Sequence, residues 1–159
     1  MGEDALEKAR PQDEHKAYAI AMGLLARREH SGYELQTKLS RRGFSADTVS
    51  HVVERLTKNN YLSDSRFADA YARSRAGKGF GPLKIRAELA QRRVDSSLVD
   101  QALDLHRGEW IDNGVHWVEK KFGVTVDRQT ELKAYRAGMR RGFSHAQMRE
   151  ILRRLKNPS

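Results

Sequence analysis

The chain contains no cysteine, which excludes disulfides and thiolate chemistry and makes a reducing compartment its natural setting. It also lacks an apolar run near the roughly 18 residues that a membrane span needs. Its N-terminus has no apolar core of the kind found in signal peptides. We therefore expect a protein of the cytoplasm that does not associate with membranes.

Catalytic signatures are missing as well. The six histidines form no pair with metal-ligand spacing on one helix turn, and no cysteine can complete a site. No serine stands in a nucleophile elbow, and no Walker sequence is present. The sequence predicts no metal, no cofactor and no enzyme activity.

Positive charge, in contrast, is abundant, with a net charge of +9. Residues 1–61 hold ten basic and nine acidic side chains, residues 62–107 hold nine and six, and residues 108–159 hold eleven and six. Such an excess favours polyanions or acidic protein surfaces. We expect the C-terminal half of the chain to make the leading contact with a partner.

The chain repeats itself. Residues 41–45 read Arg-Arg-Gly-Phe-Ser and recur at 140–144, while 91–95 carry the weaker echo Gln-Arg-Arg-Val-Asp. A period near 50 residues is typical of stacked units, each too small to bury its own apolar face. We predict an all-α fold of three tandem three-helix repeats, similar to helix-turn-helix units. A mobile arm occupies 1–14, and the repeats occupy 15–60, 61–107 and 108–159.

Local signals place the helices within each repeat. Ser31 and Glu34 have the spacing of a capping box, and Ser45 can cap the next helix. Gly43 follows a helix where a left-handed residue is favoured. Pro82 fits the first position of a helix, where its missing N–H costs nothing. In the last repeat we expect helices from about Glu109 to Gly123 and from Asp127 onward, with Trp110 and Trp117 in the core.

Two segments are candidate binding sites. The loop 77–81, Gly-Lys-Gly-Phe-Gly, is interpreted first as a flexible connection between helices, because no strand of a dinucleotide-binding fold precedes it. As a hypothesis, Lys78 and the free N–H groups of this loop touch a phosphate or a partner carboxylate. Basic residues also line two helices of the third repeat, with apolar faces of Leu132 and Tyr135 and of Ile151, Leu152 and Leu155 pointing elsewhere. The basic residues are Lys133, Arg136 and Arg140 on one helix and Arg149, Arg153 and Lys156 on the next.

A family resemblance rests on longer motifs. The stretch 61–68, Tyr-Leu-Ser-Asp-Ser-Arg-Phe-Ala, continues through 79–82 and 85–89 in a pattern that resembles the RecX family of bacterial regulatory proteins. Residues 24–31, Leu-Leu-Ala-Arg-Arg-Glu-His-Ser, are similar to the N-terminal pattern of that family, and 141–143 to its closing repeat. One departure is Arg93, where the family commonly has glycine.

The resemblance implies a modulator of the RecA recombinase, active in homologous recombination, DNA repair and the SOS response. It implies an elongated, curved, all-helical array that docks along the groove of the RecA–DNA filament and limits its assembly and activities. Such a protein catalyses nothing, and we expect this chain to act as a monomer. Contacts to single- or double-stranded DNA would go through phosphates. Besides the six cations of the third repeat, we expect Lys78 and Arg86 to contribute.

Two alternatives stay open. The repeats could bind DNA directly as helix-turn-helix domains. However, their third helices offer Ser50, His51 and Glu54 in the first repeat and Ser97, Asp100 and Gln101 in the second, whereas base readout usually needs Arg, Asn or Gln. Sequence-specific readout is therefore poorly supplied. An adaptor for another acidic protein is the other alternative.

Overall fold

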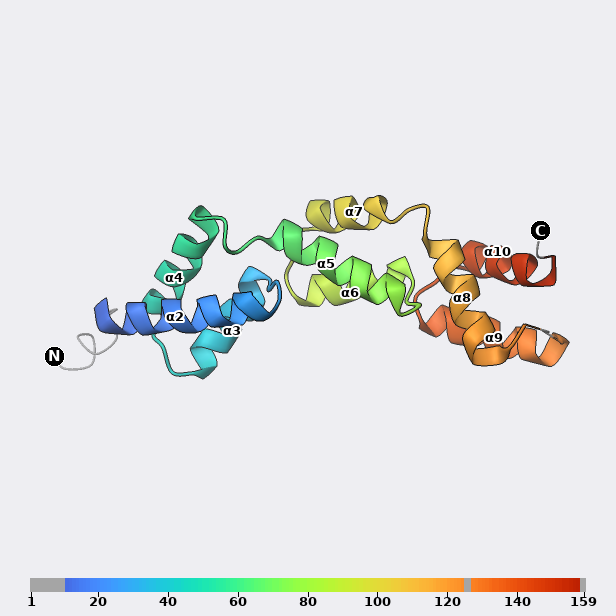
Figure 1. Cartoon of the computed structure of the whole chain (residues 1–159), viewed down its shortest axis with the longest axis horizontal. Helices are drawn as coiled ribbons and strands as arrows, with labels where there is room; N and C mark the ends of the chain where they lie inside the picture. Colours follow the sequence, from blue (N-terminus) through green and yellow to red (C-terminus); the bar gives the residue numbers. More distant parts are fainter. Residues whose placement is uncertain (1–10, 125–126, 158–159) are drawn as a thin grey trace. The chain divides into compact units, whose positions relative to one another are not determined.

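A computed structural model describes residues 11–124 and 127–157, in which all regular structure is helical (Figure 1). The all-α prediction is therefore confirmed. The helices are α2 (Pro11–Arg27), α3 (Gly32–Arg41), α4 (Ala46–Lys58), α5 (Asp64–Gly77), α6 (Pro82–Gln91), α7 (Ser96–Leu105), α8 (Trp110–Phe122), α9 (Arg128–Arg140) and α10 (His145–Lys156).

Helix α2 begins earlier than the sequence suggested. Residues 11–14 were expected in a mobile arm, and for them that prediction is wrong; residues 1–10 lie outside the described part. Asp13 and Glu14 lie in the first turn, where they stabilise the positive end of the helix dipole. Ala17 and Ala21 are fully buried and fix the helix against its neighbours.

The expected caps are present. The Glu34 N–H donates to Ser31 Oγ at 3.0 Å, and Glu34 Oε1 accepts from the Ser31 N–H at 3.2 Å, so the capping box is confirmed. Ser45 Oγ accepts from the Thr48 N–H at 3.2 Å. A second capping box starts α10 at Ser144. These bonds satisfy helix N–H groups that have no partner within the helix.

The turn that ends the second helix of each repeat is left-handed all three times. Its φ angle is +92° at Gly43 and +95° at Gly142, as glycine at these positions predicted. At the equivalent position Arg93 has a φ of +55°. The turn is therefore kept even where an L side chain has to adopt the strained conformation.

The chain divides into two compact units. One contains the described residues up to Phe67 together with Arg92–Val94, and the other contains Ala68–Gln91 and the chain from Asp95 onward. The core of the first unit joins α2, α3 and α4 around Leu35, Leu39, Val52 and Leu56. The elongated, curved arrangement of three repeats stays a prediction.

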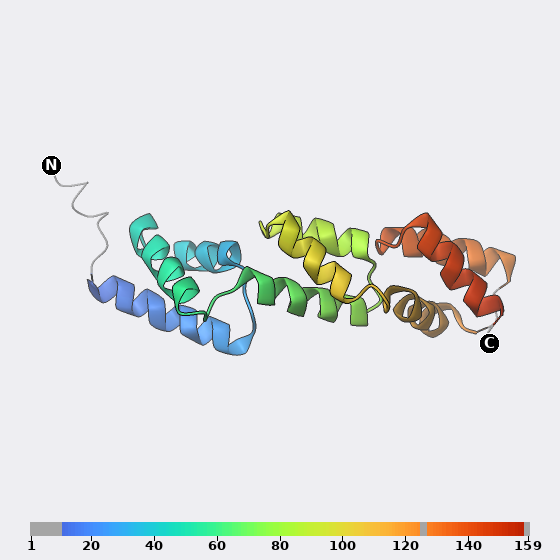
Figure 2. The ribbon, with the colours of Figure 1, turned by 90° about the horizontal axis from the view of Figure 1, so that it is seen from above.

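The core of the second unit lies among α8, α9 and α10. It includes Val118, Phe143, Met148 and Ile151, all fully buried. Figure 2 shows α10 running alongside α9, with α8 next to both. Trp110 and Trp117 are buried, which confirms their assignment to the core. This packing fixes the positions of α9 and α10, the two helices whose exposed sides carry the predicted cations of the third repeat.

Candidate binding surfaces

The glycine-rich loop before α6 packs against the turn between α9 and α10. The Gly81 N–H donates to the Arg141 carbonyl at 2.8 Å, and the Leu83 N–H donates to the Gly142 carbonyl at 3.0 Å. Gly79 lies so close to Trp117 that a Cβ would stand 2.6 Å from the tryptophan Cβ. Gly79 and Gly81 are therefore needed for close packing, since a side chain at either of these two positions would collide with a neighbour.

This packing uses the N–H groups that a phosphate would need. The N–H groups of Lys78, Gly79 and Phe80 donate to carbonyls at the end of α5, at 3.0–3.1 Å, and those of Gly81 and Leu83 are used as described. The idea that the loop offers free N–H groups to a phosphate is thus wrong. The Lys78 side chain itself is exposed.

Arg141 belongs to this junction rather than to a binding surface. Its guanidinium lies 4.2 Å from the centroid of the Phe80 ring and 4.9 Å from that of Trp117, and it donates to the Lys78 carbonyl at 2.8 Å. Burial, with the nearby charge of Arg75, lowers its pKa from the ordinary value. This role of Arg141 could not be predicted from local sequence patterns, because it depends on a contact with Lys78, about 60 positions away in the chain.

Arg86 is less available than expected. It is exposed, but its guanidinium pairs with the Asp100 carboxylate across α6 and α7. The charge of Arg86 is therefore balanced locally, and any acidic partner would have to compete with Asp100. Solvent-exposed pairs of this kind contribute little to stability, so such an exchange is inexpensive.

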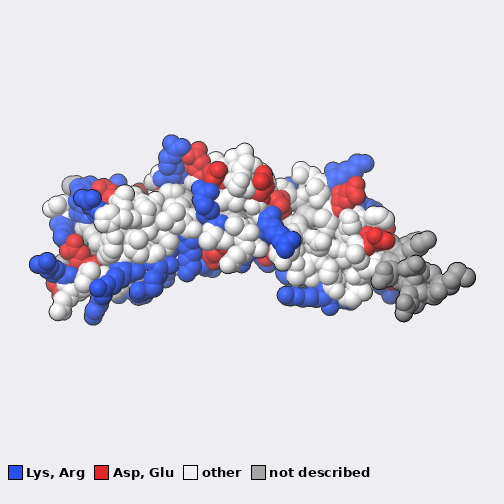
Figure 3. Space-filling view, turned by 180° about the vertical axis from the view of Figure 1, so that it is seen from behind, with Lys and Arg blue, Asp and Glu red and all other residues white. Residues whose placement is uncertain are grey.

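Three exposed cations form what we name the α9 stripe: Lys133, Arg136 and Arg140. Within residues 11–124 and 127–157 none of them makes an ion pair. In Figure 3, where α9 lies at the lower left, Lys and Arg side chains follow that edge of the molecule. Among the described residues, only Lys133 has a carboxylate near enough to interact with it, that of Asp127, whose pKa the Lys133 charge helps to lower.

The buried face of α9 is not the one predicted. Ala134, Ala137 and Gly138 face the core, and a Cβ at Gly138 would stand 2.5 Å from Met148 Cε. Leu132, expected in an apolar buried face, is 50% exposed. Small residues let α9 approach α10 closely, which leaves the larger apolar side chains at the edge of the contact.

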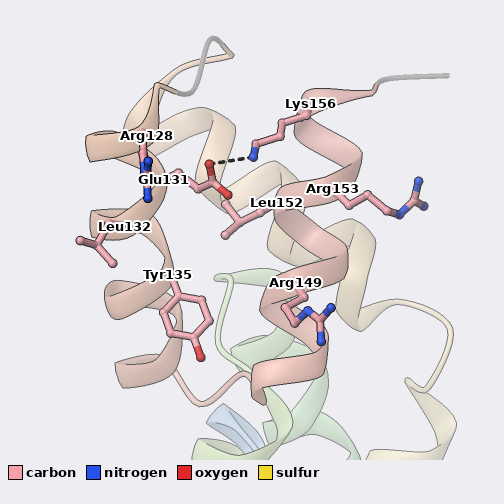
Figure 4. Close-up of a pocket in the computed structure, with 8 residues that line it drawn as sticks. All are labelled: Arg128, Glu131, Leu132, Tyr135, Arg149, Leu152, Arg153 and Lys156. Atoms are coloured by element: carbon pink, nitrogen blue, oxygen red, sulfur yellow. Dashed lines mark ion pairs between the residues drawn. The ribbon is translucent and has the colours of Figure 1, made fainter.

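Leu132 instead borders an open groove between α9 and α10, with a volume of about 860 Å³ (Figure 4). We name it the α9–α10 groove. Its apolar surface comes from Leu132, Tyr135 and Leu152. Four cations and one carboxylate complete the lining: Arg128, Arg149, Arg153, Lys156 and Glu131. The α10 cations therefore border this groove and do not extend the α9 stripe, so the six cations do not form one surface.

The cations of α10 differ in whether they form ion pairs. Lys156 Nζ lies 2.8 Å from Glu131 Oε2 across the groove, and Arg153 lies 2.7 Å from Glu150 Oε1. Hydrogen bonds from Arg153 and Arg154 lower the pKa of Glu150 to about 2. Arg149 makes no ion pair within the described chain. The uncompensated cations of the groove are thus Arg149, on α10, and Arg128, on α9.

No cluster of three or more His, Asp or Glu side chains suited to a metal ion occurs among the described residues. No helix among them combines the length and the apolar character that crossing a bilayer requires.

Known families and proteins resemble this chain over most of its length. The family model of the RecX first three-helix domain matches residues 17–56, and that of the second matches residues 63–103. Regulatory protein RecX of Xanthomonas axonopodis pv. citri (strain 306) is 39% identical over 153 residues, covering 95% of this chain and 94% of the relative. That of Stenotrophomonas maltophilia (strain R551-3) is 37% identical over 148 residues, covering 92% and 90%.

Solved structures agree in fold. The crystal structure of RecX from Lactobacillus salivarius superimposes with a TM-score of 0.78 at 22% identity, covering 92% of this chain and 99% of that one. A second RecX crystal structure gives a TM-score of 0.72 at 20% identity, covering 89% of this chain and 73% of the other. These likenesses support the same helical architecture.

Proposed function

Because the chain belongs to the RecX family of regulatory proteins, we propose that it binds the RecA–DNA filament along its groove and limits its recombinase, ATPase and filament-extension activities. The observation that best supports this proposal is the α9 stripe, which we take as the binding surface. Lys133, Arg136 and Arg140 are exposed and form no ion pair in the described chain, although Asp127 lies near enough to Lys133 to interact with its charge. No direct ion pair therefore has to break when the stripe meets a polyanion.

The α9 stripe has the dimensions of an extended contact. At 1.5 Å of rise per residue, the positions 133 and 140 lie about 10 Å apart along the helix. All three side chains point from the same side of a helix whose opposite side is held by the core. The stripe can thus meet successive negative charges, either DNA phosphates or carboxylates of RecA subunits, without rearrangement of the fold.

The remaining predicted cations act as secondary contacts. Lys78, beside the α5–α6 loop, and Arg149, on α10, are exposed and have no ion pair among the described residues. Arg86, Arg153 and Lys156 each have a carboxylate partner to exchange. Since exposed pairs are weak, these three add little net affinity and mainly affect orientation.

Inhibition would result from the bound protein occupying the filament groove, not from a reaction that it catalyses. Contacts from several repeats to neighbouring subunits of one filament act as linked weak sites, which raises affinity when their spacing fits the polymer. A monomer acting in the cytoplasm suffices for this, and no catalytic step is required. A bound molecule would block the groove of the RecA–DNA filament and prevent the addition of further RecA subunits.

The decisive experiment is titration of the protein into RecA assembled on single-stranded DNA, with ATP hydrolysis and filament length as readouts. The test variant carries Arg136→Glu and Arg140→Glu. The control carries Arg41→Glu and Arg42→Glu, which make the same charge change at exposed positions in the turn of the first repeat. Circular dichroism verifies that both variants are folded.

We expect the wild type and the control to inhibit, and the stripe variant to need at least about tenfold more protein, equivalent to about 1.4 kcal/mol. Equal loss in both variants would mean that only overall charge matters. An unchanged RecA reaction with the wild-type protein, beside tight binding to DNA alone, would favour the helix-turn-helix alternative.

A further inference from the structure

The α9–α10 groove differs from the α9 stripe in chemistry. The stripe is purely cationic, whereas the groove combines three apolar side chains with a cationic border. Leu132 is half exposed, and Leu152 extends toward α9 from the facing helix (Figure 4). An apolar surface left open between cations indicates a ligand that brings both apolar side chains and negative charge.

We propose that the α9–α10 groove is a docking site for a short acidic peptide segment of a protein partner, with apolar side chains on one face. The inference rests on the proposed function only in placing the protein beside a protein polymer. The groove of about 860 Å³ is within the range of side-chain and ligand pockets. The apolar side chains of the segment contact Leu132, Tyr135 and Leu152, and its carboxylates meet Arg128 and Arg149.

Charge complementarity selects an acidic segment. Four of the five charged residues at the groove are cationic. The carboxylate, Glu131, is already bound by Lys156 at 2.8 Å, so it is neutralised within the groove. Arg128 and Arg149 are exposed on opposite helices and have no ion pair in the described chain. They are therefore placed to meet carboxylates on both sides of an inserted segment.

Nucleic acid fits this groove less well. Single strands bind by stacking bases on exposed aromatic rings, and the groove has one aromatic residue beside two leucines. That ring, Tyr135, is held edge-on to His145 with a centroid separation of 5.5 Å, and its hydroxyl is hydrogen-bonded to the His145 ring. Aliphatic contacts favour the side chains of a peptide over bases.

The geometry accommodates a helical segment. Helices α9 and α10 have 13 and 12 residues, so the groove between them is on the order of 18 Å long at 1.5 Å per residue. An amphipathic helix of about three turns has this length and would present apolar side chains at positions i, i+3 or i+4, and i+7. The described helices contribute no such occupant of their own, because the groove is open.

The probe is a fluorescein-labelled 12-residue peptide with leucine at positions i, i+4 and i+7 and mostly glutamate elsewhere. Its binding to the full-length protein is followed by fluorescence anisotropy at low salt. Two control peptides replace the leucines by serine or the glutamates by lysine. Because RecA is absent, the outcome does not depend on whether the protein regulates RecA.

Two groove variants are tested against one variant that lies outside both the groove and the α9 stripe. Arg149→Glu removes a border cation and Leu132→Ala removes an exposed apolar side chain, and neither residue is buried. Arg42→Glu makes the same charge change as Arg149→Glu at an exposed position directly after α3, where no ion pair is formed in the described chain. Thermal unfolding by circular dichroism verifies that all three variants are folded.

We expect Arg149→Glu to weaken peptide binding about tenfold and Leu132→Ala about fivefold, with less than about twofold loss for Arg42→Glu. Both control peptides should bind at least about tenfold more weakly than the probe. The proposal is overturned if the probe does not bind, if the serine peptide binds equally well, or if Arg42→Glu and Arg149→Glu have equal effects. It is also overturned if Leu132→Ala weakens binding of a single-stranded oligonucleotide but leaves peptide binding intact.

Discussion

Gly81 lies directly against the backbone of Gly142, where a Cβ on Gly81 would stand 2.5 Å from the amide nitrogen of Phe143. The two glycines are in different repeats, and hydrogen bonds at 2.8 and 3.0 Å join the segments around them. Contact of backbone with backbone leaves no flexible side chain that could move aside. The second unit is therefore held together at a point where any side chain is excluded.

Substitution of Gly142 should be far more costly than the same change at Gly43. Both glycines occur in the sequence Arg-Arg-Gly-Phe-Ser, with φ angles of +95° and +92°. A Cβ at Gly43 meets open space, whereas one at Gly142 collides with Lys84. We expect Gly43→Ala to cost about 1–2 kcal/mol through the left-handed backbone alone. Gly142→Ala should cost about 2 kcal/mol more.

Urea unfolding measures the two costs separately. Both tryptophans of the chain, Trp110 and Trp117, lie in the second unit, so their fluorescence reports on that unit, while circular dichroism reports on all helices. Gly142→Ala should shift the fluorescence transition to lower urea, and Gly43→Ala should shift only the dichroism. Equal midpoints for the two variants would contradict a packing role of Gly142.

The third left-handed turn yields a different prediction. Arg93 has a φ of +55°, and its guanidinium lies 4.5 Å from the centroid of the Tyr33 ring. Arg93→Gly removes the backbone strain, but it loses the cation–π contact and increases the conformational entropy of the unfolded chain. We expect its stability within about 1 kcal/mol of the wild type. Arg93→Val puts a β-branched residue at positive φ and should cost about 1–2 kcal/mol. Equal stability of the two variants by urea titration would show that this turn is unstrained.

Local signals in the sequence predicted much of the fold. The capping box of Ser31 with Glu34 and the left-handed turns at Gly43 and Gly142 depend on atoms within a few residues of each other. The same reasoning predicted α6 from Pro82, because its fixed φ suits the first helical turn. Such features are encoded in short segments, so sequence spacing alone is enough to find them.

Contacts between distant segments could not be predicted this way. The face of α9 was assigned from its large apolar residues, Leu132 and Tyr135, yet the core side consists of Ala134, Ala137 and Gly138. Small residues give little hydrophobic periodicity, although they allow the closest helix contact. The groove and the role of Arg141 depend on that packing, so neither could be inferred before the helices were placed.

The first unit should lose stability as the solution becomes mildly acidic. His30 is 1% exposed, its Nδ1 lies 3.0 Å from the Arg28 carbonyl, and its Nε2 lies 2.8 Å from Lys38 Nζ. A neutral ring can donate to the carbonyl and accept from the ammonium, whereas a protonated ring would lose the second bond. Burial first, and the charges of Arg28 and Lys38 next, lower the pKa of His30 below 6.5.

The direction of the pH effect follows from proton uptake. Below pH 6.5 the unfolded chain binds a proton at His30 before the folded chain does, so the free energy of unfolding falls as pH drops toward the folded pKa. Melting temperatures between pH 7.5 and 5 should show this loss, and His30→Gln should reduce its slope. His116→Gln, at an exposed position, is the control and should keep the slope. An identical slope in His30→Gln would exclude His30 as its source.

The last prediction concerns a carboxylate that restrains two cations. Glu150 accepts hydrogen bonds from Arg153 at 2.7 Å and from Arg154 at 3.1 Å, which together lower its pKa to about 2. It therefore stays ionised from pH 4.5 upward, and its contribution to stability is lost only as pH falls below 4.5 toward 2. Glu150→Gln leaves Arg153, which borders the α9–α10 groove, without this counter-charge, whereas Arg154 keeps its ion pair with Asp112.

We expect Glu150→Gln to strengthen binding of the acidic peptide about two- to fivefold at low salt, the size of one exposed charge interaction, and the gain should shrink as salt screens it. Glu119→Gln removes the same charge from α8 and serves as the control. Anisotropy titrations at pH 7 compare the two variants. A gain of equal size in Glu119→Gln would mean that net charge, rather than release of Arg153 at the groove, determines the affinity.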